Sequence, residues 1–225
     1  MSLPAAVFFD LDGTLVDTAP DFHAIVNRLR AELELPPINY AAVRACVSDG
    51  ASAVIKAAFP GFSHNEAKLI ELRDAFLADY QENLAQHSCL FEGLPAFLTQ
   101  LESLNIHWGV VTNKPSRFTT PLMLGLNLAQ RSAATVCADE VSQTKPHPEP
   151  MFKAANIAGV NAAHCIYVGD HIRDIEAGRR AGMFTIAAGW GYIHQEDDIK
   201  SWGADLICGS VSDLSHWLTT LTKQD

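Results

Sequence analysis

Three short apolar runs in this chain each end at a polar residue, and this pattern limits the folds that the chain can adopt. The runs at 7–9, 108–111 and 165–168 are followed by Asp10, Thr112 and Gly169-Asp170. Such runs are typical of buried parallel strands, whose carboxyl ends carry the polar side chains. Weaker strand candidates lie at 134–138, 184–187 and 205–207, and helical stretches lie at about 95–104, 116–129, 148–158, 173–181 and 212–221. Alternating strands and helices predict an α/β fold, in which helices cover both faces of a parallel sheet.

Residues 17–90 differ from the rest of the chain because they contain no convincing strand. A helix is expected from about Pro20 to Glu34, with Asp17 or Thr18 as its N-cap. The stretch 63–66 fits a capping box at Ser63 for a second helix, which reaches about Gln86. Apolar residues of this helix recur at three- and four-residue spacing and predict one buried face: Leu69, Leu72, Phe76, Tyr80 and Leu84. We therefore expect a helical cap at 17–90, inserted into a core of residues 1–16 and 91–225.

The charge balance of the chain argues against nucleic-acid binding. Sixteen Lys and Arg against 26 Asp and Glu give a net charge of −10, whereas affinity for a phosphate backbone comes mainly from clustered cations. A phosphate site in this chain must therefore carry its own cations. The five cysteines are scattered and lack a CxxC pair, so we expect free thiols. We find no cationic N-terminal segment and no apolar stretch of about 18 residues, so we expect a cytoplasmic protein without a membrane partner.

Asp10 and Asp12 form a pair of carboxylates directly after the first expected strand, and this pair suits phosphoryl transfer. The chain reverses after Asp10, so its side chain and the Asp12 backbone carbonyl can face one hard cation, and Mg2+ prefers oxygen ligands. Asp10 can then attack phosphorus and form an aspartyl phosphate. The Asp12 side chain is left to protonate the leaving oxygen and to deprotonate the hydrolytic water. Gly13 allows close backbone approach, and its amide can donate to phosphate. Taken alone, these residues also fit a polar turn that closes a strand.

Four further residues stand where a phosphate site needs them. Thr112 can donate its hydroxyl proton to a phosphate oxygen, or it can cap the following helix. Lys145 lies in a proline-rich loop and can neutralise both the nucleophile and the phosphate, or it can be a solvated lysine. Asp170 can complete the shell of a metal ion, or it can cap a helix. Asp174 lies one helical turn later and can bind metal through water or hold Lys145.

Together these residues give the chain a family resemblance. The set resembles the haloacid dehalogenase superfamily of phosphohydrolases, with all four motifs in order: Asp10 with Asp12, then Thr112, then Lys145, then Asp170 with Asp174. The resemblance covers nearly the whole chain. It implies a Rossmann-like, doubly wound core in which the Asp10 strand is central. It also implies magnesium-dependent hydrolysis of a small phosphorylated metabolite.

The helical insert resembles that of phosphoglycolate phosphatases, and some stretches are more similar to the bacterial N-acetylmuramic acid 6-phosphate phosphatases of cell-wall recycling. These stretches lie at 18–22, 87–93, 108–115 and 191–194. The resemblance favours N-acetylmuramic acid 6-phosphate as the substrate, with 2-phosphoglycolate as the alternative. Two residues depart from that branch. His171 stands where a further Asp is expected beside the metal, and Asp49 stands where Gly is expected.

Candidate substrate contacts lie next to these motifs. Asn113, Lys114 and Arg117 follow Thr112, and the two cations can hold a distal anionic group such as a carboxylate, or can simply begin a helix. In the cap, Ser48 and Gly50 belong to a loop that resembles one dipping into the core site, with amides at a helix N-terminus.

Several other functions compete with a phosphatase. A sugar phosphomutase shares the core and the cap, and a regulatory protein on an inactive core is the rival from another class, although the complete motif set argues against it. A dehalogenase does not require Asp12, and a transport ATPase needs membrane spans. His23, His87 and His194 lie near expected hinge or site segments, but no HxH or HExxH spacing supports zinc. Trp190 and Trp202 are expected to pack, and the sequence does not indicate an oligomeric state.

Overall fold

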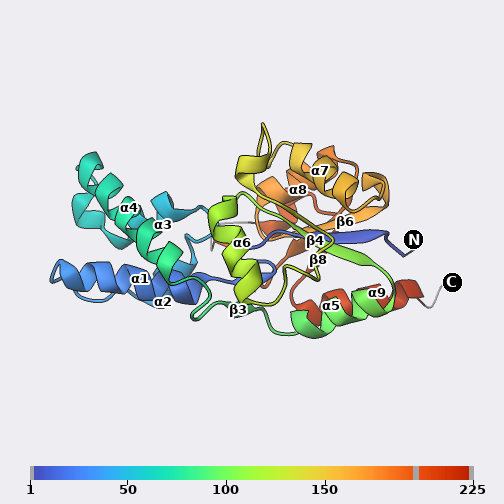
Figure 1. Cartoon of the computed structure of the whole chain (residues 1–225), viewed down its shortest axis with the longest axis horizontal. Coiled ribbons are helices and arrows are strands. Elements are labelled where there is room, and N and C mark those ends of the chain that lie inside the picture. Colours follow the sequence, from blue (N-terminus) through green and yellow to red (C-terminus); the bar gives the residue numbers. More distant parts are fainter. Residues whose placement is uncertain (1–2, 195–197, 223–225) are drawn as a thin grey trace.

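A six-stranded parallel sheet forms the centre of the molecule (Figure 1). The computed structural model describes residues 3–194 and 198–222. The strand order is β5-β4-β1-β6-β7-β8, and every neighbouring pair is parallel. The strands are β1 (Ala6–Phe9), β4 (His107–Val111), β5 (Ala134–Val136), β6 (Cys165–Gly169), β7 (Phe184–Ala188) and β8 (Leu206–Cys208). The predicted Rossmann-like α/β class and the central position of the Asp10 strand are confirmed.

Helices cover both faces of the sheet, and the alternation of side chains along β1 explains why. Val7 and Phe9 pack in one apolar cluster with α5 (Leu94–Ser103) and α9 (Val211–Thr222). Ala6 and Phe8 pack in another, with α7 (Glu149–Ile157) and α8 (Ile172–Arg180). Figure 1 shows the first two helices below the sheet and the other two above it. Because successive side chains of a strand point to opposite faces, a strand covered on both faces is apolar throughout.

Residues 19–82 form a helical insert to one side of the sheet, on the left in Figure 1. Its elements are α1 (Ala19–Glu32), α2 (Tyr40–Arg44), α3 (Ala51–Ala58), the 3₁₀ turn η1 (Pro60–Phe62) and α4 (Glu66–Glu82). They enclose an apolar core of their own. Its Phe22 ring meets Phe76 and Tyr80 edge to face, with ring centroids 5.0 and 4.8 Å apart. Three residues of the face predicted for α4, Leu72, Phe76 and Tyr80, are buried, whereas Leu69 is half-buried and Leu84 lies beyond the end of the helix.

The two chain crossings between the sheet and the insert pair with each other. β2 (Val16–Asp17) and β3 (Cys89–Leu90) form a two-stranded antiparallel ribbon. The sequence does not reveal this ribbon, because two residues are too few to show a periodic pattern. The buried Asp21 carboxylate ties the same junction, since it accepts the His87 amide at 2.7 Å and the Ser88 amide at 3.2 Å. The cap limits at 17 and 90 lie in these strands and stay a prediction.

Some helix boundaries differ from those expected. Asn65, and not Ser63, is the N-cap of α4, and its side chain accepts the Lys68 amide at 3.1 Å. Both residue types cap helices well, so the sequence alone does not choose between them. Helix α4 ends at Glu82 and not at 86. Helix α6 (Ser116–Gly125) ends before the predicted residue 129, and Asn127, two residues after this helix, adopts a φ of 57°. The remaining 3₁₀ turns are η2 (Ala138–Glu140), η3 (Ala162–His164) and η4 (Ile199–Trp202).

The expected state of the cysteines and tryptophans is also present. All five cysteines are unpaired, Trp202 is buried, and Trp190 packs against a core cluster. Within the described ranges, no helix combines the length and the apolar character needed to cross a membrane.

The Tyr192 hydroxyl fastens the start of the insert to the core. Thr18 is the N-cap of α1, but its side chain makes no capping bond. Instead, the Thr18 and Ala19 amides donate to the Tyr192 hydroxyl oxygen at 2.7 and 2.9 Å, and this hydroxyl donates to Asp17 at 2.6 Å. A side chain of the core thus satisfies amides that a local cap would otherwise satisfy.

We predict that Tyr192→Phe destabilises the protein, because it removes the acceptor of the buried Thr18 amide and leaves the Ala19 amide only its longer bond to Asp17, at 3.3 Å. The expected loss in the free energy of unfolding is about 1–3 kcal/mol, measured by urea denaturation. Tyr80→Phe is the matched control, since the Tyr80 hydroxyl is buried but has no hydrogen-bond partner in the described ranges. Its removal should leave stability unchanged or raise it, because no hydrogen bond in the described part of the chain is lost. Equal losses in the two variants would contradict this account of the junction.

Candidate active site

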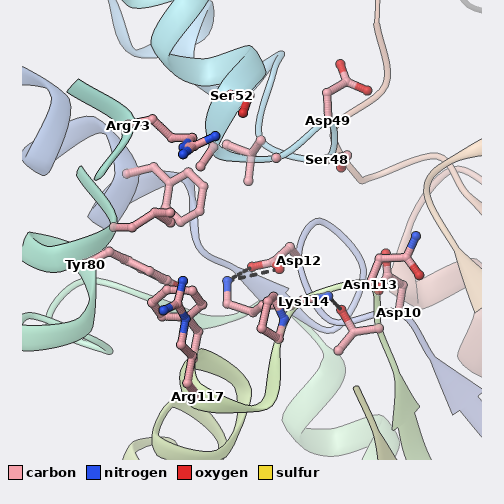
Figure 2. A pocket seen from close by; sticks show the side chains of 18 of the residues that line it. Asp10, Asp12, Ser48, Asp49, Ser52, Arg73, Tyr80, Asn113, Lys114 and Arg117 are labelled. Atoms are coloured by element: carbon pink, nitrogen blue, oxygen red, sulfur yellow. Dashed lines mark hydrogen bonds and ion pairs between the residues drawn. The ribbon is translucent and has the colours of Figure 1, made fainter. Parts of the chain in front are cut away.

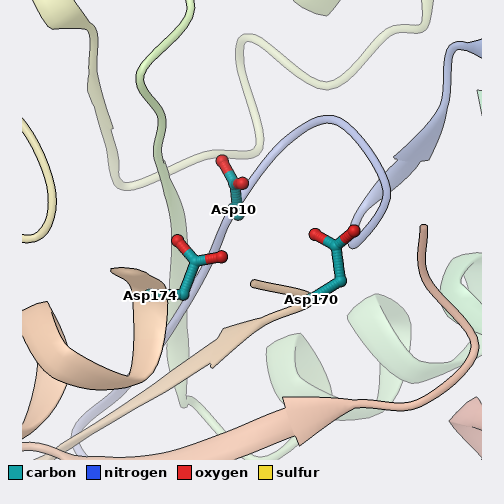
Figure 3. Close-up of side chains that lie close together, drawn as sticks. All are labelled: Asp10, Asp170 and Asp174. Atoms are coloured by element: carbon teal, nitrogen blue, oxygen red, sulfur yellow. The ribbon is translucent and has the colours of Figure 1, made fainter. Parts of the chain in front are cut away.

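Three buried carboxylates gather where the strands of the sheet end. Asp10 follows β1 and Asp170 follows β6, and these two strands are parallel neighbours in register. Asp174 comes from the first turn of α8. Figure 3 shows the three side chains close together, and one oxygen of each lies within 4.8 Å of the others. Because parallel strands end at the same edge, the sheet itself brings these groups together.

The turn after β1 has to approach Asp170 closely. Gly13 adopts a φ of +85°, and a Cβ at this position would overlap the Asp170 carboxylate. The Gly13 amide donates to the Val16 carbonyl at 3.0 Å and so closes the turn. Gly13 is not among the residues that line the adjacent cavity. In this arrangement the turn uses the Gly13 amide, and its contact with phosphate stays a prediction.

Lys145 lies between two of the carboxylates and is fully buried. Its Nζ atom is 2.9 Å from Asp10 Oδ1 and 2.7 Å from Asp174 Oδ1. The ammonium also donates to the Val111 carbonyl at 2.9 Å and to the Tyr167 hydroxyl at 2.8 Å. Lys145 is thus not a solvated loop lysine. Of the two roles left open for Asp174, the structure shows it holding Lys145.

Asn113 holds the loop that carries Lys145. Its side-chain amide donates to the Lys145 carbonyl at 3.0 Å, and its side-chain oxygen accepts the Lys145 amide at 3.1 Å. These two bonds fix the backbone from which the ammonium projects. Asn113 also lines the cavity, but its polar atoms serve this loop here, whereas the sequence assigned them to the substrate.

Burial and neighbouring charges give the three carboxyl groups different pKa values. Burial, together with the charges of Asp10 and Asp174, raises the pKa of Asp170 to about 7. Burial also raises the pKa of Asp174, against the opposing effect of Lys145. Burial alone would raise the pKa of Asp10 as well, but the positive charges of Lys145 and Arg173 outweigh burial and hold this pKa below its usual value. Asp10 is therefore an anion, the state that a carboxylate nucleophile needs.

The same cluster fits a hard divalent cation. The three oxygens within 4.8 Å of one another are of the type that Mg2+ prefers. The raised pKa of Asp170 indicates repulsion that a bound cation would relieve. Asp170 is also oriented, because it accepts the Thr14 hydroxyl at 2.8 Å and the Tyr192 amide at 2.9 Å. Asp10, Asp170 and Asp174 are therefore the side chains that can hold a metal ion.

A cavity of about 600 Å³ lies between the core and the helical insert. Figure 2 shows Asp10 and Asp12 on its wall together with residues of the insert. Ser48 and Gly50, from the loop before α3, also line it. The Ser48 hydroxyl donates to Asp170 at 3.0 Å, so this loop of the insert lies directly against the carboxylate cluster.

Lys114 is paired with Asp12 at the wall of this cavity. Its Nζ atom lies 2.9 and 3.1 Å from the two Asp12 carboxylate oxygens, and the Thr18 hydroxyl donates to Asp12 at 2.6 Å. Burial would lower the pKa of Lys114, but the Asp12 charge raises it above its usual value. The sequence assigned Lys114 to a distal anionic group of the substrate. In the structure it serves Asp12 instead, because an ammonium that is 9% exposed needs a counter-charge.

Thr112 and Arg117 also line the cavity. The Thr112 hydroxyl oxygen accepts the Lys114 amide at 3.1 Å, which leaves its proton for a ligand. Thr112 does not cap the following helix, because the N-cap of α6 is Pro115; its role toward phosphate stays a prediction. Arg117 is exposed, with its guanidinium carbon 4.6 Å from the centre of the Phe118 ring. None of the three histidines singled out above, His23, His87 and His194, is among the described residues that line this cavity.

The cavity wall also contains residues that were not predicted as site residues, among them Arg73, Tyr80 and Arg173. Arg173 helps to lower the pKa of Asp10, and its Nε atom is buried without a partner in the described part of the chain. The position of Arg173 in the sequence, between Asp170 and Asp174, could have indicated a site residue, because a cation there lies near both carboxylates. The sequence predicts Tyr80 only as part of the buried face of its helix, and nothing in the sequence distinguishes Arg73 from other cations on a helix surface.

The two residues that depart from the expected pattern lie close together. Asp49 Oδ2 is 2.8 Å from His194 Nε2, and Asp49 Oδ1 is 3.7 Å from His171 Nε2. Burial and Arg173 lower the pKa of His171. A carboxylate therefore still lies beside position 171, but the insert carries it and not the core.

Comparisons with known proteins identify the family of this chain. A family model described as haloacid dehalogenase-like hydrolase matches residues 7–188. An N-acetylmuramic acid 6-phosphate phosphatase of Pseudomonas aeruginosa is 48% identical over 202 residues, which cover 90% of this chain and 89% of that protein. A phosphoglycolate phosphatase of Xanthomonas campestris pv. campestris is 43% identical over 208 residues, with 92% and 93% covered. A crystal structure of a predicted phosphoglycolate phosphatase from Haemophilus somnus has a TM-score of 0.82 at 25% identity, covering 96% of this chain and 99% of that chain. The chain belongs to the haloacid dehalogenase-like hydrolase family.

Proposed function

We propose that this phosphatase hydrolyses N-acetylmuramic acid 6-phosphate. The observation that carries the proposal is the 48% identity, over 90% of the chain, to a phosphatase named for that substrate. The activity class itself follows from the family and from several relatives named as phosphatases.

The catalytic steps that we propose use Asp10 and Asp12. An Asp10 oxygen forms a bond to phosphorus while the bond from phosphorus to the leaving oxygen breaks, and Asp12 gives that oxygen a proton. Water then attacks the aspartyl phosphate, Asp12 takes a proton from it, and inorganic phosphate leaves with Asp10 restored. Lys114 Nζ lies 2.9 Å from an Asp12 carboxylate oxygen. We expect this ion pair to open when Asp12 gives its proton to the leaving oxygen.

We propose Mg2+ as the cofactor, held by Asp10, Asp170 and Asp174 together with the Asp12 backbone carbonyl. Bound there, it would supply positive charge that offsets repulsion between the carboxylate nucleophile and a phosphate dianion. Lys145 adds a fixed positive charge 2.9 Å from Asp10, and Thr112 offers a hydroxyl donor to a phosphate oxygen.

The size of the cavity supports a sugar phosphate over a smaller acid. Its volume of about 600 Å³ falls within the range of about 300–1,000 Å³ that drug-sized ligands occupy. 2-Phosphoglycolate is much smaller and would leave most of that volume to water. It is the alternative substrate, because a relative with 43% identity is named phosphoglycolate phosphatase. Both compounds carry a carboxylate, so charge alone does not separate them.

We further propose a cytoplasmic location and a role in the recycling of cell-wall sugars. The unpaired cysteines fit a reducing compartment. The net charge of −10 disfavours nucleic acid as a partner, so the proposed partner is a small phosphorylated metabolite.

We predict that kcat/KM for N-acetylmuramic acid 6-phosphate exceeds that for 2-phosphoglycolate by about 100-fold, or about 2.7 kcal/mol of transition-state stabilisation. The measurement is release of inorganic phosphate with Mg2+ from both compounds and from a panel of sugar phosphates. Asp10→Asn is the control and should show no turnover, while its circular dichroism spectrum stays that of the parent. A preference for 2-phosphoglycolate would make that compound the proposed substrate. Full activity of Asp10→Asn would exclude Asp10 as the nucleophile.

We predict that the affinity for Mg2+ falls on acidification, because Asp170, with a pKa of about 7, must lose its proton to bind a metal ion. The carboxylate form dominates above pH 7 and the protonated form dominates below it. The dissociation constant measured by titration calorimetry should therefore be about tenfold higher at pH 6 than at pH 8. Asp170→Asn should bind Mg2+ weakly, with no such dependence on pH. A constant affinity from pH 6 to pH 8 in the parent protein would overturn the assignment.

A further inference from the structure

Two arginines from different parts of the fold line the same cavity. Arg73 belongs to α4 of the insert, and Arg117 belongs to the first turn of α6 in the core. In Figure 2 both lie with Tyr80 on the side of the cavity away from Asp10. The cavity therefore has an acidic reacting end and a separate wall that carries positive charge.

The other two cations of the cavity wall are engaged near the reacting end. Lys114 is bound to the Asp12 carboxylate. Arg173 donates to the Ser48 carbonyl and acts on the charge of Asp10. The Lys114 ammonium lies 4.7 Å from the centre of the Tyr80 ring, but the Asp12 carboxylate already neutralises it. Arg73 and Arg117 are therefore the cations of the described cavity wall that are placed for a second anionic group.

The guanidinium of Arg73 is available to a ligand. Its ion pair in the described ranges is with the next residue, Asp74, at 2.8 Å, where the two side chains are 38% and 60% exposed. An exposed pair of this kind contributes little free energy, so a ligand carboxylate can replace Asp74 at small cost. Arg117 makes no ion pair within the described residues, and its guanidinium lies over the Phe118 ring.

The Tyr80 hydroxyl gives independent evidence for a polar ligand. Tyr80 is 1% exposed and lines the cavity, yet its hydroxyl has no hydrogen-bond partner in the described part of the chain. Its ring is fixed by edge-to-face contact with Phe22 and by stacking on Phe76. A buried hydroxyl without a partner is unfavourable, and an oxygen of a ligand in the cavity would remove that penalty.

We propose that Arg73 is a specificity-determining residue, which binds the carboxylate of the substrate at the end of the cavity away from Asp10. Arg117 faces the same carboxylate from the core, and the Tyr80 hydroxyl donates to an oxygen of the substrate. A guanidinium suits this task, because its paired N–H groups match the two oxygens of a carboxylate. The substrate class is thus a phosphomonoester whose second anionic group is separated from phosphate by a spacer of sugar size. This inference rests on the proposed function and names the residue that selects the substrate.

The test compares Arg73→Ala with the parent on two substrates that differ in the carboxylate. N-Acetylmuramic acid 6-phosphate carries a lactyl carboxylate, and N-acetylglucosamine 6-phosphate is the same sugar phosphate without it. Arg73→Ala should lower kcat/KM about 10- to 100-fold for the first, mainly by raising KM, because the bond lost is to a charged group. For the second it should change kcat/KM by less than about threefold. Arg73→Lys should retain part of the selectivity, since it keeps the charge but loses the paired geometry.

Lys68→Ala is the matched control. Lys68 lies on the same helix, pairs with Glu71 at 2.7 Å and is not among the residues of the cavity wall. Lys68→Ala removes one positive charge from α4, as Arg73→Ala does, and should leave kcat/KM unchanged for both substrates. Equal losses on the two substrates in Arg73→Ala, or no loss on either, would overturn the proposal.

A second substrate pair separates this proposal from the proposed function. 6-Phosphogluconate and glucose 6-phosphate also differ in a carboxylate far from the phosphate. If the parent protein does not hydrolyse N-acetylmuramic acid 6-phosphate but Arg73→Ala selectively loses 6-phosphogluconate, the proposed function fails and the role of Arg73 stands. If the parent protein hydrolyses N-acetylmuramic acid 6-phosphate and the variant does so equally well, the role of Arg73 fails and the proposed function stands.

Discussion

One buried ammonium allows the acidic reaction centre to exist. The Lys145, Asp10 and Asp174 side chains are 0%, 6% and 0% exposed, and Lys145 lies within 2.9 Å of both carboxylates. Unpaired charges at that depth would cost more free energy than a folded domain has to spare. The backbone serves this contact: β1 and α8 supply the carboxylates, and Asn113, two residues after β4, holds the loop that carries the ammonium. Lys145 does not neutralise all three carboxyl groups, and burial beside Asp10 and Asp174 raises the pKa of Asp170. A metal ion bound to the cluster would supply the missing positive charge.

The core and the insert contribute different chemistry to one cavity. The core supplies Asp10, the proposed nucleophile, and the buried Lys145, while the insert supplies Ser48, Arg73 and Tyr80 to the cavity wall. The two parts are tied at the junction by Tyr192, whose amide also binds Asp170. Arg73 and Tyr80 of the insert bind none of the three clustered carboxylates within the described residues, whereas Ser48 of the insert donates directly to Asp170.

The sheet and the reaction centre were predictable because their signals are local. An apolar run that ends in Asp10 or Thr112 shows both a strand and a polar edge in a few residues. The pairing of Lys114 with Asp12 was not predictable, because it depends on which side chains become buried together. The same holds for Tyr80, which the sequence predicts as ordinary packing and whose hydroxyl has no partner among the residues that the structure describes. The departures at Asp49 and His171 were visible singly, but only the fold shows that they lie close together.

The central claim is that Asp10 receives the phosphoryl group. The most direct measurement quenches the enzyme during turnover, reduces any aspartyl phosphate with borohydride and locates the product by peptide mass spectrometry. The account predicts homoserine at position 10 in the protein quenched with substrate, and unmodified Asp10 in the protein quenched without it. Turnover at full rate with no trapped group, or with the modification at another carboxylate, would contradict it.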